Sequence, residues 1–170
     1  RIFREENGFD IVANFSAHKH VRSEKDKYSV QALIENNDIK AKKLMDLLCV
    51  YPPRHFFCVS TDKAANPVNL YGATKLASDK LFVAANNLVG NQDIKFSVVR
   101  YGNVVGSRGS VVPFFKKLIC EGVKELPITD ERMTRFFITL EDGVNFVLKN
   151  FERMQGGEIF VPKIPSITIN

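Results

Sequence analysis

One stretch of the sequence decides the fold: Ser60-Thr61-Asp62-Lys63-Ala64-Ala65-Asn66-Pro67-Val68-Asn69-Leu70-Tyr71-Gly72-Ala73-Thr74-Lys75. It follows the apolar run 55–59, which is short enough to be a buried parallel strand. Asn66-Pro67 marks a loop, and helix-forming residues continue from about Tyr71 to about Asn87. The stretch therefore predicts the end of a strand, a polar loop and the start of a helix.

Tyr71 and Lys75 are four residues apart, so a helix would place both side chains on one face. A nearby ammonium group favours a phenolate and lowers the pKa of a tyrosine from its usual value of about 10. The polar residues 60–63 lie at the carboxyl end of the preceding strand, where ligands bind in open α/β sheets. We therefore expect Tyr71 to be a base, the alternative being a chance pair on a surface helix.

Strands and helices alternate along the rest of the chain. The expected strands are 10–16, 55–59, 94–101 and 158–162, and the expected helices are 30–50, 71–87, 111–122 and 141–151. Residues 128–138 are expected to be irregular, and residues 167–170 to begin another strand. The alternation predicts an α/β protein with parallel βαβ units and a sheet covered on both faces.

No Gly-x-Gly-x-x-Gly follows any of these strands, and the glycines at 102, 106 and 109 have other spacing. A pyrophosphate-binding turn would therefore have to precede Arg1. The chain also begins without a methionine and stops at Asn170 inside an expected strand. We expect a fragment that holds the C-terminal part of a doubly wound parallel sheet and lacks the N-terminal strands.

Composition is ordinary for a globular protein, with 45% hydrophobic residues among 170. The net charge of +5 comes from 24 basic and 19 acidic residues without a basic run, which fits an anionic small ligand better than nucleic acid. Cys49, Cys58 and Cys120 form no Cys-x-x-Cys pair, so neither a disulfide framework nor a zinc site is indicated. These features favour a cytoplasmic protein, and no apolar run approaches the roughly 18 residues of a membrane span.

With these elements placed, the sequence resembles the extended short-chain dehydrogenase/reductase family over essentially its whole length. The shared elements are Ser16-Ala17, Asn37, Ser60-Thr61, Tyr71-x-x-x-Lys75 and Arg100-Tyr101-Gly102-Asn103-Val104. The resemblance implies that residues 1–102 are the C-terminal half of an NAD(P)-binding Rossmann domain. It implies that residues 103–170 are a substrate-binding region interleaved with the last Rossmann elements.

The same resemblance implies a nicotinamide cofactor. We expect NADP, with NAD left open because the residue that chooses between them would precede Arg1. The cofactor-binding residues that the resemblance implies are Ser16, Ala17, Asn37, Ser60, Tyr71, Lys75 and Tyr101. The sequence departs from the family at Lys40, where a glycine is common. Family members tend to assemble through helices that flank the active site, so a homo-oligomer is expected.

Within this family, the sequence is similar to the inverting UDP-N-acetylglucosamine 4,6-dehydratases at residues 60–67, 72–75, 108–114 and 133–139. The Asp62-Lys63 pair separates this group from its relatives. At the same place, retaining dehydratases of other nucleotide sugars have a sequence like Thr-Asp-Glu, and 4-epimerases usually have a serine-rich stretch. A surface salt pair is the alternative interpretation of these two residues. A UDP-sugar 4-epimerase, or a non-catalytic module that keeps the fold, remains the alternative function.

The resemblance also implies a role for each site residue. Tyr71 would be the base in oxidation at C4 of the sugar, Lys75 would lower its pKa and hold the cofactor ribose, and Thr61 would bind the C4 oxygen. Lys63 would donate the proton that inverts C5, and Asp62 would assist loss of the C6 hydroxyl as water. The division of C5 deprotonation and C6 protonation between Asp62 and Lys63 is left open.

The expected substrate contacts come from the second part of the chain. Arg108 and Arg135 would bind the diphosphate or the uridine of a UDP-sugar, because a guanidinium offers a planar fork to phosphate oxygens. Asn103 would contact the phosphate region or cap a turn. His18 and His20 are interpreted as loop residues or partial substrate contacts, and no metal site is expected because no third ligand lies nearby.

Overall fold

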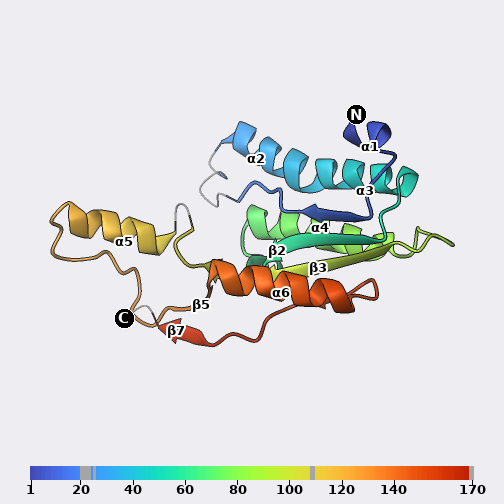
Figure 1. Cartoon of the computed structure of the whole chain (residues 1–170). Helices are drawn as coiled ribbons and strands as arrows, with labels where there is room; N and C mark the ends of the chain where they lie inside the picture. Colours follow the sequence, from blue (N-terminus) through green and yellow to red (C-terminus); the bar gives the residue numbers. More distant parts are fainter. Residues whose placement is uncertain (20–23, 25, 108–109, 169–170) are drawn as a thin grey trace. The chain divides into compact units, whose positions relative to one another are not determined.

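The computed structural model describes residues 1–19, 24, 26–107 and 110–168 (Figure 1). The chain divides into two compact units. The first unit comprises Arg1–Arg100 and Lys149–Val161, and the second comprises Tyr101–Leu148 and Pro162–Asn170. No helix among the described residues combines the length and the apolar character that a membrane span needs.

The first unit is built on a four-stranded sheet. Its strands, in spatial order, are β1 (Ile11–Asn14), β2 (His55–Thr61), β3 (Lys95–Tyr101) and β6 (Ile159–Phe160). β1 runs parallel to β2, and β3 runs parallel to β6. The predicted α/β class with parallel strands is confirmed, although β1 and β6 are shorter than expected.

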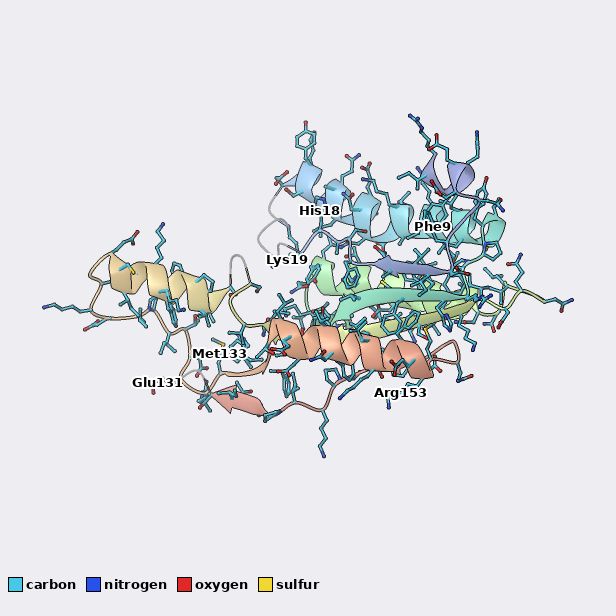
Figure 2. All side chains as sticks on the ribbon, viewed as in Figure 1. Phe9, His18, Lys19, Glu131, Met133 and Arg153 are labelled. Atoms are coloured by element: carbon cyan, nitrogen blue, oxygen red, sulfur yellow. The ribbon has the colours of Figure 1, made fainter. Side chains whose placement is uncertain are left out.

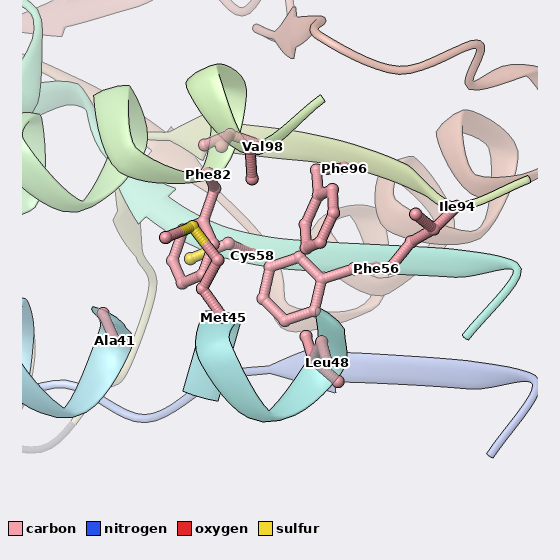
Figure 3. Close-up of a cluster of buried hydrophobic side chains, with 10 residues drawn as sticks. Ala41, Met45, Leu48, Phe56, Cys58, Phe82, Ile94, Phe96 and Val98 are labelled. Atoms are coloured by element: carbon pink, nitrogen blue, oxygen red, sulfur yellow. The ribbon is translucent and has the colours of Figure 1, made fainter. Parts of the chain in front are cut away.

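Aromatic side chains hold two helices against one face of this sheet. The rings of Phe82 and Phe96 lie 4.6 and 5.3 Å from that of Phe56, and all three side chains are fully buried. Figure 3 shows this cluster between β2, β3, α3 (Lys40–Val50) and α4 (Leu70–Ala85). Burying each phenyl group contributes about 2 kcal/mol, so the cluster fixes α4 on the sheet.

The opposite face of β2 is covered as well. Successive strand residues point to opposite faces, so Phe57 faces away from Phe56 and stacks on Phe160, with ring centroids 6.2 Å apart. His55 packs 4.9 Å from Phe151, which lies in α6 (Leu140–Arg153). The expected cover on both faces is therefore found at β2, whereas Ile11 on β1 is exposed.

The helix expected at 30–50 is interrupted. A π-helical turn, η2 (Glu35–Ile39), lies between α2 (Lys27–Ile34) and α3. Such turns insert an extra residue and are frequent at functional sites. Asn37 is buried at this turn, and its carbonyl oxygen accepts a hydrogen bond from Ser78 on α4. Apolar periodicity alone could not reveal this insertion.

The second unit contains β4 (Asn103–Val104), α5 (Val111–Cys120), β5 (Thr134–Ile138) and β7 (Ser166–Thr168). β5 pairs in parallel with β4 and antiparallel with β7. The expectation that residues 128–138 are irregular throughout was therefore wrong. Strand pairing with partners some thirty residues away in each direction determines β5, and local sequence does not show it. The first unit also contains a short N-terminal helix, α1 (Ile2–Glu5), and the turn η3 (Asp62–Ala64).

Candidate active site

The carboxyl end of β2 carries a connected polar cluster. Thr61 caps η3, and its Oγ1 donates a hydrogen bond of 2.9 Å to Oδ1 of Asp62. The same carboxylate oxygen accepts from Nζ of Lys63 at 3.0 Å. The side chains of Asp62 and Lys63 are 33% and 38% exposed, so this ion pair is partly accessible to solvent.

The start of α4 packs closely on this cluster. Asn69 caps the helix by accepting a 2.8 Å hydrogen bond from the backbone nitrogen of Gly72. A Cβ atom on Gly72 would lie 2.5 Å from the carbonyl oxygen of Lys63, so only glycine permits this approach. As a result Tyr71 lies beside the end of β2, where the side chain of Thr61 acts to lower the pKa of its phenol.

The electrostatics of Tyr71 differ from the expectation. The pKa of Tyr71 is raised above its usual value, chiefly by burial and further by the charges of Asp62 and Asp79, while the side chain of Thr61 opposes this rise. Lys75 is 3% exposed and donates through Nζ to the carbonyl oxygen of Val59 at 3.2 Å. Burial therefore outweighs any lowering of the Tyr71 pKa in this structure, and the role of Lys75 in lowering that pKa stays a prediction.

A buried ion pair that the sequence analysis missed lies behind the cluster. Asp79 is fully buried, and its Oδ2 accepts from Nε of Arg100 at 2.7 Å and from Oγ of Ser60 at 2.9 Å. Asp79 follows Lys75 by four residues on the same helical face, and that spacing was the available signal. The hydroxyl of Ser60 thus binds a protein carboxylate here, and its cofactor contact stays a prediction.

Asn37 links the segment after β1 to α4. Its Nδ2 donates to the carbonyl oxygen of His18 and to Oγ1 of Thr74, both at 3.0 Å, and its Oδ1 accepts from the His18 nitrogen at 2.9 Å. Figure 2 shows His18 in this segment. The side chain of Asn37 therefore positions the backbone around Ser16 and Ala17, and direct cofactor binding by Asn37 stays a prediction.

A pocket of about 440 Å³ opens at the carboxyl end of β1. Its wall includes Ser16 and Ala17, as well as Asn36 and Lys40 from the facing helix. A polar pocket with one cationic side chain at the end of a parallel strand fits a nucleotide cofactor. Among the described residues, no three His, Cys, Asp or Glu side chains lie together as metal ligands.

The remaining predicted residues, apart from His20, belong to the second unit. Asn103 lies on β4 opposite Phe137, and Arg135 lies on β5 with one guanidinium nitrogen donating to the Thr134 carbonyl oxygen at 2.8 Å. Tyr101 is half-buried, and burial raises its pKa. Arg108 and His20 lie outside the described residues. The roles of these residues stay predictions.

A parallel α/β unit that presents Tyr71 and Lys75 on one helix beside a polar strand end defines a short-chain dehydrogenase/reductase. The chain belongs to the polysaccharide biosynthesis protein family, whose sequence model matches residues 1–170. The family resemblance seen in the sequence motifs is thereby confirmed.

Two curated relatives and one solved structure refine this placement. The chain is 63% identical over 160 residues to UDP-N-acetylglucosamine 4,6-dehydratase (inverting) of Campylobacter jejuni, covering 94% of this chain and 47% of that protein. It is 39% identical over 163 residues to UDP-glucose 4-epimerase of Rickettsia canadensis, covering 96% and 47%. The structure of Pen from Bacillus thuringiensis superimposes with a TM-score of 0.87 at 32% identity, covering 95% of this chain and 48% of that one. The chain spans about half the length of the curated relatives that it matches.

Proposed function

We propose that the intact protein is a UDP-N-acetylglucosamine 4,6-dehydratase that inverts the configuration at C5. The observation that carries this proposal is the Asp62–Lys63 ion pair, which accepts a hydrogen bond from Thr61 and whose aspartate charge acts on the candidate base Tyr71. A 4-epimerase needs only to remove and return hydrogen at C4, whereas a dehydratase also needs acid and base groups at C5 and C6. The relative of that name at 63% identity supports the same assignment.

Tyr71 and Thr61 would act on the C4 hydroxyl. Tyr71 takes its proton, and the Thr61 hydroxyl binds the oxygen while the ketone forms. A bound nicotinamide cofactor, which we propose to be NADP, would accept hydrogen from C4 and return it to C6. Because burial raises the pKa of Tyr71, its phenolate form depends on the opposing effect of the Thr61 side chain on this pKa and on charges that a ligand would bring.

Asp62 and Lys63 would act on the other two carbons. The C4 ketone acidifies the proton on C5, and its removal allows the C6 hydroxyl to leave as water. We assign removal of the C5 proton to the Asp62 carboxylate, which passes this proton to the leaving hydroxyl, and delivery of a proton to the opposite face of C5 to Lys63. Both side chains are partly exposed at the end of β2, which leaves them accessible to a sugar.

The rest of the ligand requires cationic and polar partners. We propose that Arg135 and Arg108 bind the diphosphate or uridine of the UDP-sugar and that Asn103 contacts its phosphate region. We also propose that Ser16 and Ala17 line the cofactor site, on the support of the pocket that they border. Assembly into a homo-oligomer through a face of α4 is part of this proposal.

Mass spectrometry tests the proposed reaction. The intact protein, incubated with UDP-N-acetylglucosamine and NADP, should form a product lighter by one water. The Tyr71→Phe variant should form none, because the C4 hydroxyl keeps its proton. If the wild-type protein forms no product that has lost water, the dehydratase assignment is contradicted.

A second candidate function is UDP-sugar 4-epimerisation. The 39% identity to UDP-glucose 4-epimerase of Rickettsia canadensis supports this alternative. In the same experiment, an epimerase would form an isomer of unchanged mass, UDP-N-acetylgalactosamine. A non-catalytic module would form neither product.

A further inference from the structure

The backbone nitrogen of Tyr71 is bonded to a residue from a distant part of the chain. It donates a hydrogen bond of 3.2 Å to a carboxylate oxygen of Glu24, which lies 47 positions earlier in the sequence. We propose that Glu24 is a positioning residue, which fixes the place of Tyr71 and thereby directs its phenol toward the C4 hydroxyl of the sugar. This inference rests on the proposed function and adds to it a residue that acts through Tyr71.

The position of Tyr71 in its helix explains why its backbone needs an outside partner. The first N–H groups of a helix find no carbonyl acceptor within that helix. At the start of α4, Asn69 accepts the N–H of Gly72 at 2.8 Å. Glu24 accepts the N–H of Tyr71 in the same turn. Asn69 adjoins the helix, so its bond moves with α4, whereas Glu24 comes from the connection between β1 and α2 and links this turn to another part of the first unit.

The carbonyl oxygen of Tyr71 is linked to the same connection. It accepts a hydrogen bond of 3.0 Å from Oγ1 of Thr74, which itself accepts from Nδ2 of Asn37. The side chain of Asn37 also binds the backbone of His18, which follows β1. Both polar backbone groups of Tyr71 are therefore bonded, directly by Glu24 or through Asn37, to the chain between β1 and α2. Because both groups are held, the direction in which the Cα–Cβ bond carries the phenol is fixed.

The Glu24 bond suits a role in placement and is distinct from the charges that raise the pKa of Tyr71. Those charges belong to Asp62 and Asp79. The carboxylate of Glu24 instead meets an N–H group at the positive end of a helix dipole, where a charge-assisted hydrogen bond is stronger than a neutral one. The bond is partly buried, which limits competition from water. It therefore restrains a base whose misplacement by about 1 Å would slow the reaction about 100-fold.

Steady-state kinetics of the intact protein with UDP-N-acetylglucosamine and NADP test the role of Glu24. Glu24→Ala should lower kcat about 10-fold, which is part of the loss that a full misplacement of the base would cause. KM should remain near its wild-type value, because the variant keeps the groups proposed to bind the UDP-sugar. Glu24→Gln should regain most of kcat, because its amide oxygen still accepts from the Tyr71 nitrogen. The control is Glu5→Ala, which removes an exposed partner of Arg1 and should leave kcat unchanged.

Hydrogen exchange at the Tyr71 amide tests the bond without reference to activity. Exchange should be slow in the wild-type protein and in Glu24→Gln, which both offer an acceptor, and faster in Glu24→Ala. A wild-type Tyr71 amide that exchanges as fast as in an unfolded chain would overturn the bond itself, and this measurement needs no variant.

Three kinetic results would overturn the positioning role. One is a folded Glu24→Ala variant with the wild-type kcat. Another is a rise in KM without a fall in kcat, which would make Glu24 a binding residue. The third is a Glu24→Gln variant that is as slow as Glu24→Ala. A wild-type protein that forms no dehydrated product would instead overturn the proposed function, and hydrogen exchange would still test the Glu24 bond.

Discussion

The Nε atom of Arg100 lies 2.7 Å from Oδ2 of Asp79, in an ion pair whose aspartate side chain is fully buried. Ser60 donates to the same oxygen, so this pair connects the ends of β2 and β3 to the helix that carries Tyr71 and Lys75. The pair therefore positions the candidate catalytic helix against the strand end. It also raises the pKa of Tyr71 through the charge of Asp79.

Removal of the charge of Asp79 should destabilise the protein. Asp79→Asn keeps the shape of the side chain but leaves Arg100 as an uncompensated, mostly buried charge, which should lower the free energy of unfolding by about 3 kcal/mol. Urea denaturation measures this change. Asp130→Asn is the control, because Asp130 pairs with the exposed Arg132. This variant should unfold at the same urea concentration as the wild-type protein. Equal stability of Asp79→Asn and wild type would contradict the positioning role.

Gly72→Ala should separate α4 from the active-site cluster. Its Cβ atom would lie 2.5 Å from the Lys63 carbonyl oxygen and 3.1 Å from the Cβ atom of Pro67, so the loop or the helix must move. We expect about a 100-fold loss of kcat, because a shift of this size misplaces Tyr71 and Lys63 relative to each other. Steady-state kinetics measure the loss.

The control for this substitution is Gly143→Ala in α6. There the added Cβ atom would meet only the ring of Tyr101 at 3.9 Å, an ordinary contact, so kcat should be unaffected. If Gly72→Ala keeps the wild-type kcat while it folds normally, the close approach of α4 has no catalytic importance.

The sequence allowed prediction of features that depend on local spacing. Tyr71 and Lys75 share a helical face as their separation predicts, and Asp62 with Lys63 follows a buried strand as the apolar run 55–59 predicts. The buried partners of Asp79 and Asn37 could not be predicted from the sequence. Asp79 meets Arg100 from 21 positions away, and Asn37 meets Thr74 from 37 positions away, so both contacts depend on tertiary packing. The raised pKa of Tyr71 has the same origin, because burial depends on the whole core and the Tyr71–Lys75 spacing does not reveal it.

The pKa of Tyr71 should depend on the charge of Asp62. Ultraviolet difference spectra, with Tyr71→Phe as the reference, should place the wild-type pKa above the usual value of 10.0 because of burial. Asp62→Asn should lower that pKa, since the carboxylate charge disfavours the phenolate. Asp26→Asn, at an exposed helix cap, should have no effect. An unchanged or higher pKa in Asp62→Asn would contradict the coupling of these groups.

Asp38 should make stability depend on pH. Burial raises its pKa from 3.8 to about 6, although Lys75 and Ser78 oppose the rise. The folded protein therefore holds this proton more tightly than the unfolded chain, and stability should fall as the pH rises from 3.8 to about 6. Asp38→Asn should flatten this part of the stability curve in urea denaturation. Asp46→Asn, which removes an exposed partner of Lys42, should leave the curve parallel to that of wild type, and parallel curves for Asp38→Asn would contradict the prediction.

The central claim is that Asp62 and Lys63 give this protein inverting dehydratase chemistry. NMR spectroscopy of the product that the intact protein forms from UDP-N-acetylglucosamine in D2O tests it most directly. The predicted product is a 4-keto-6-deoxy sugar nucleotide that carries deuterium at C5 in the inverted configuration. A dehydrated product with retained configuration at C5, or UDP-N-acetylgalactosamine without loss of water, would contradict the claim.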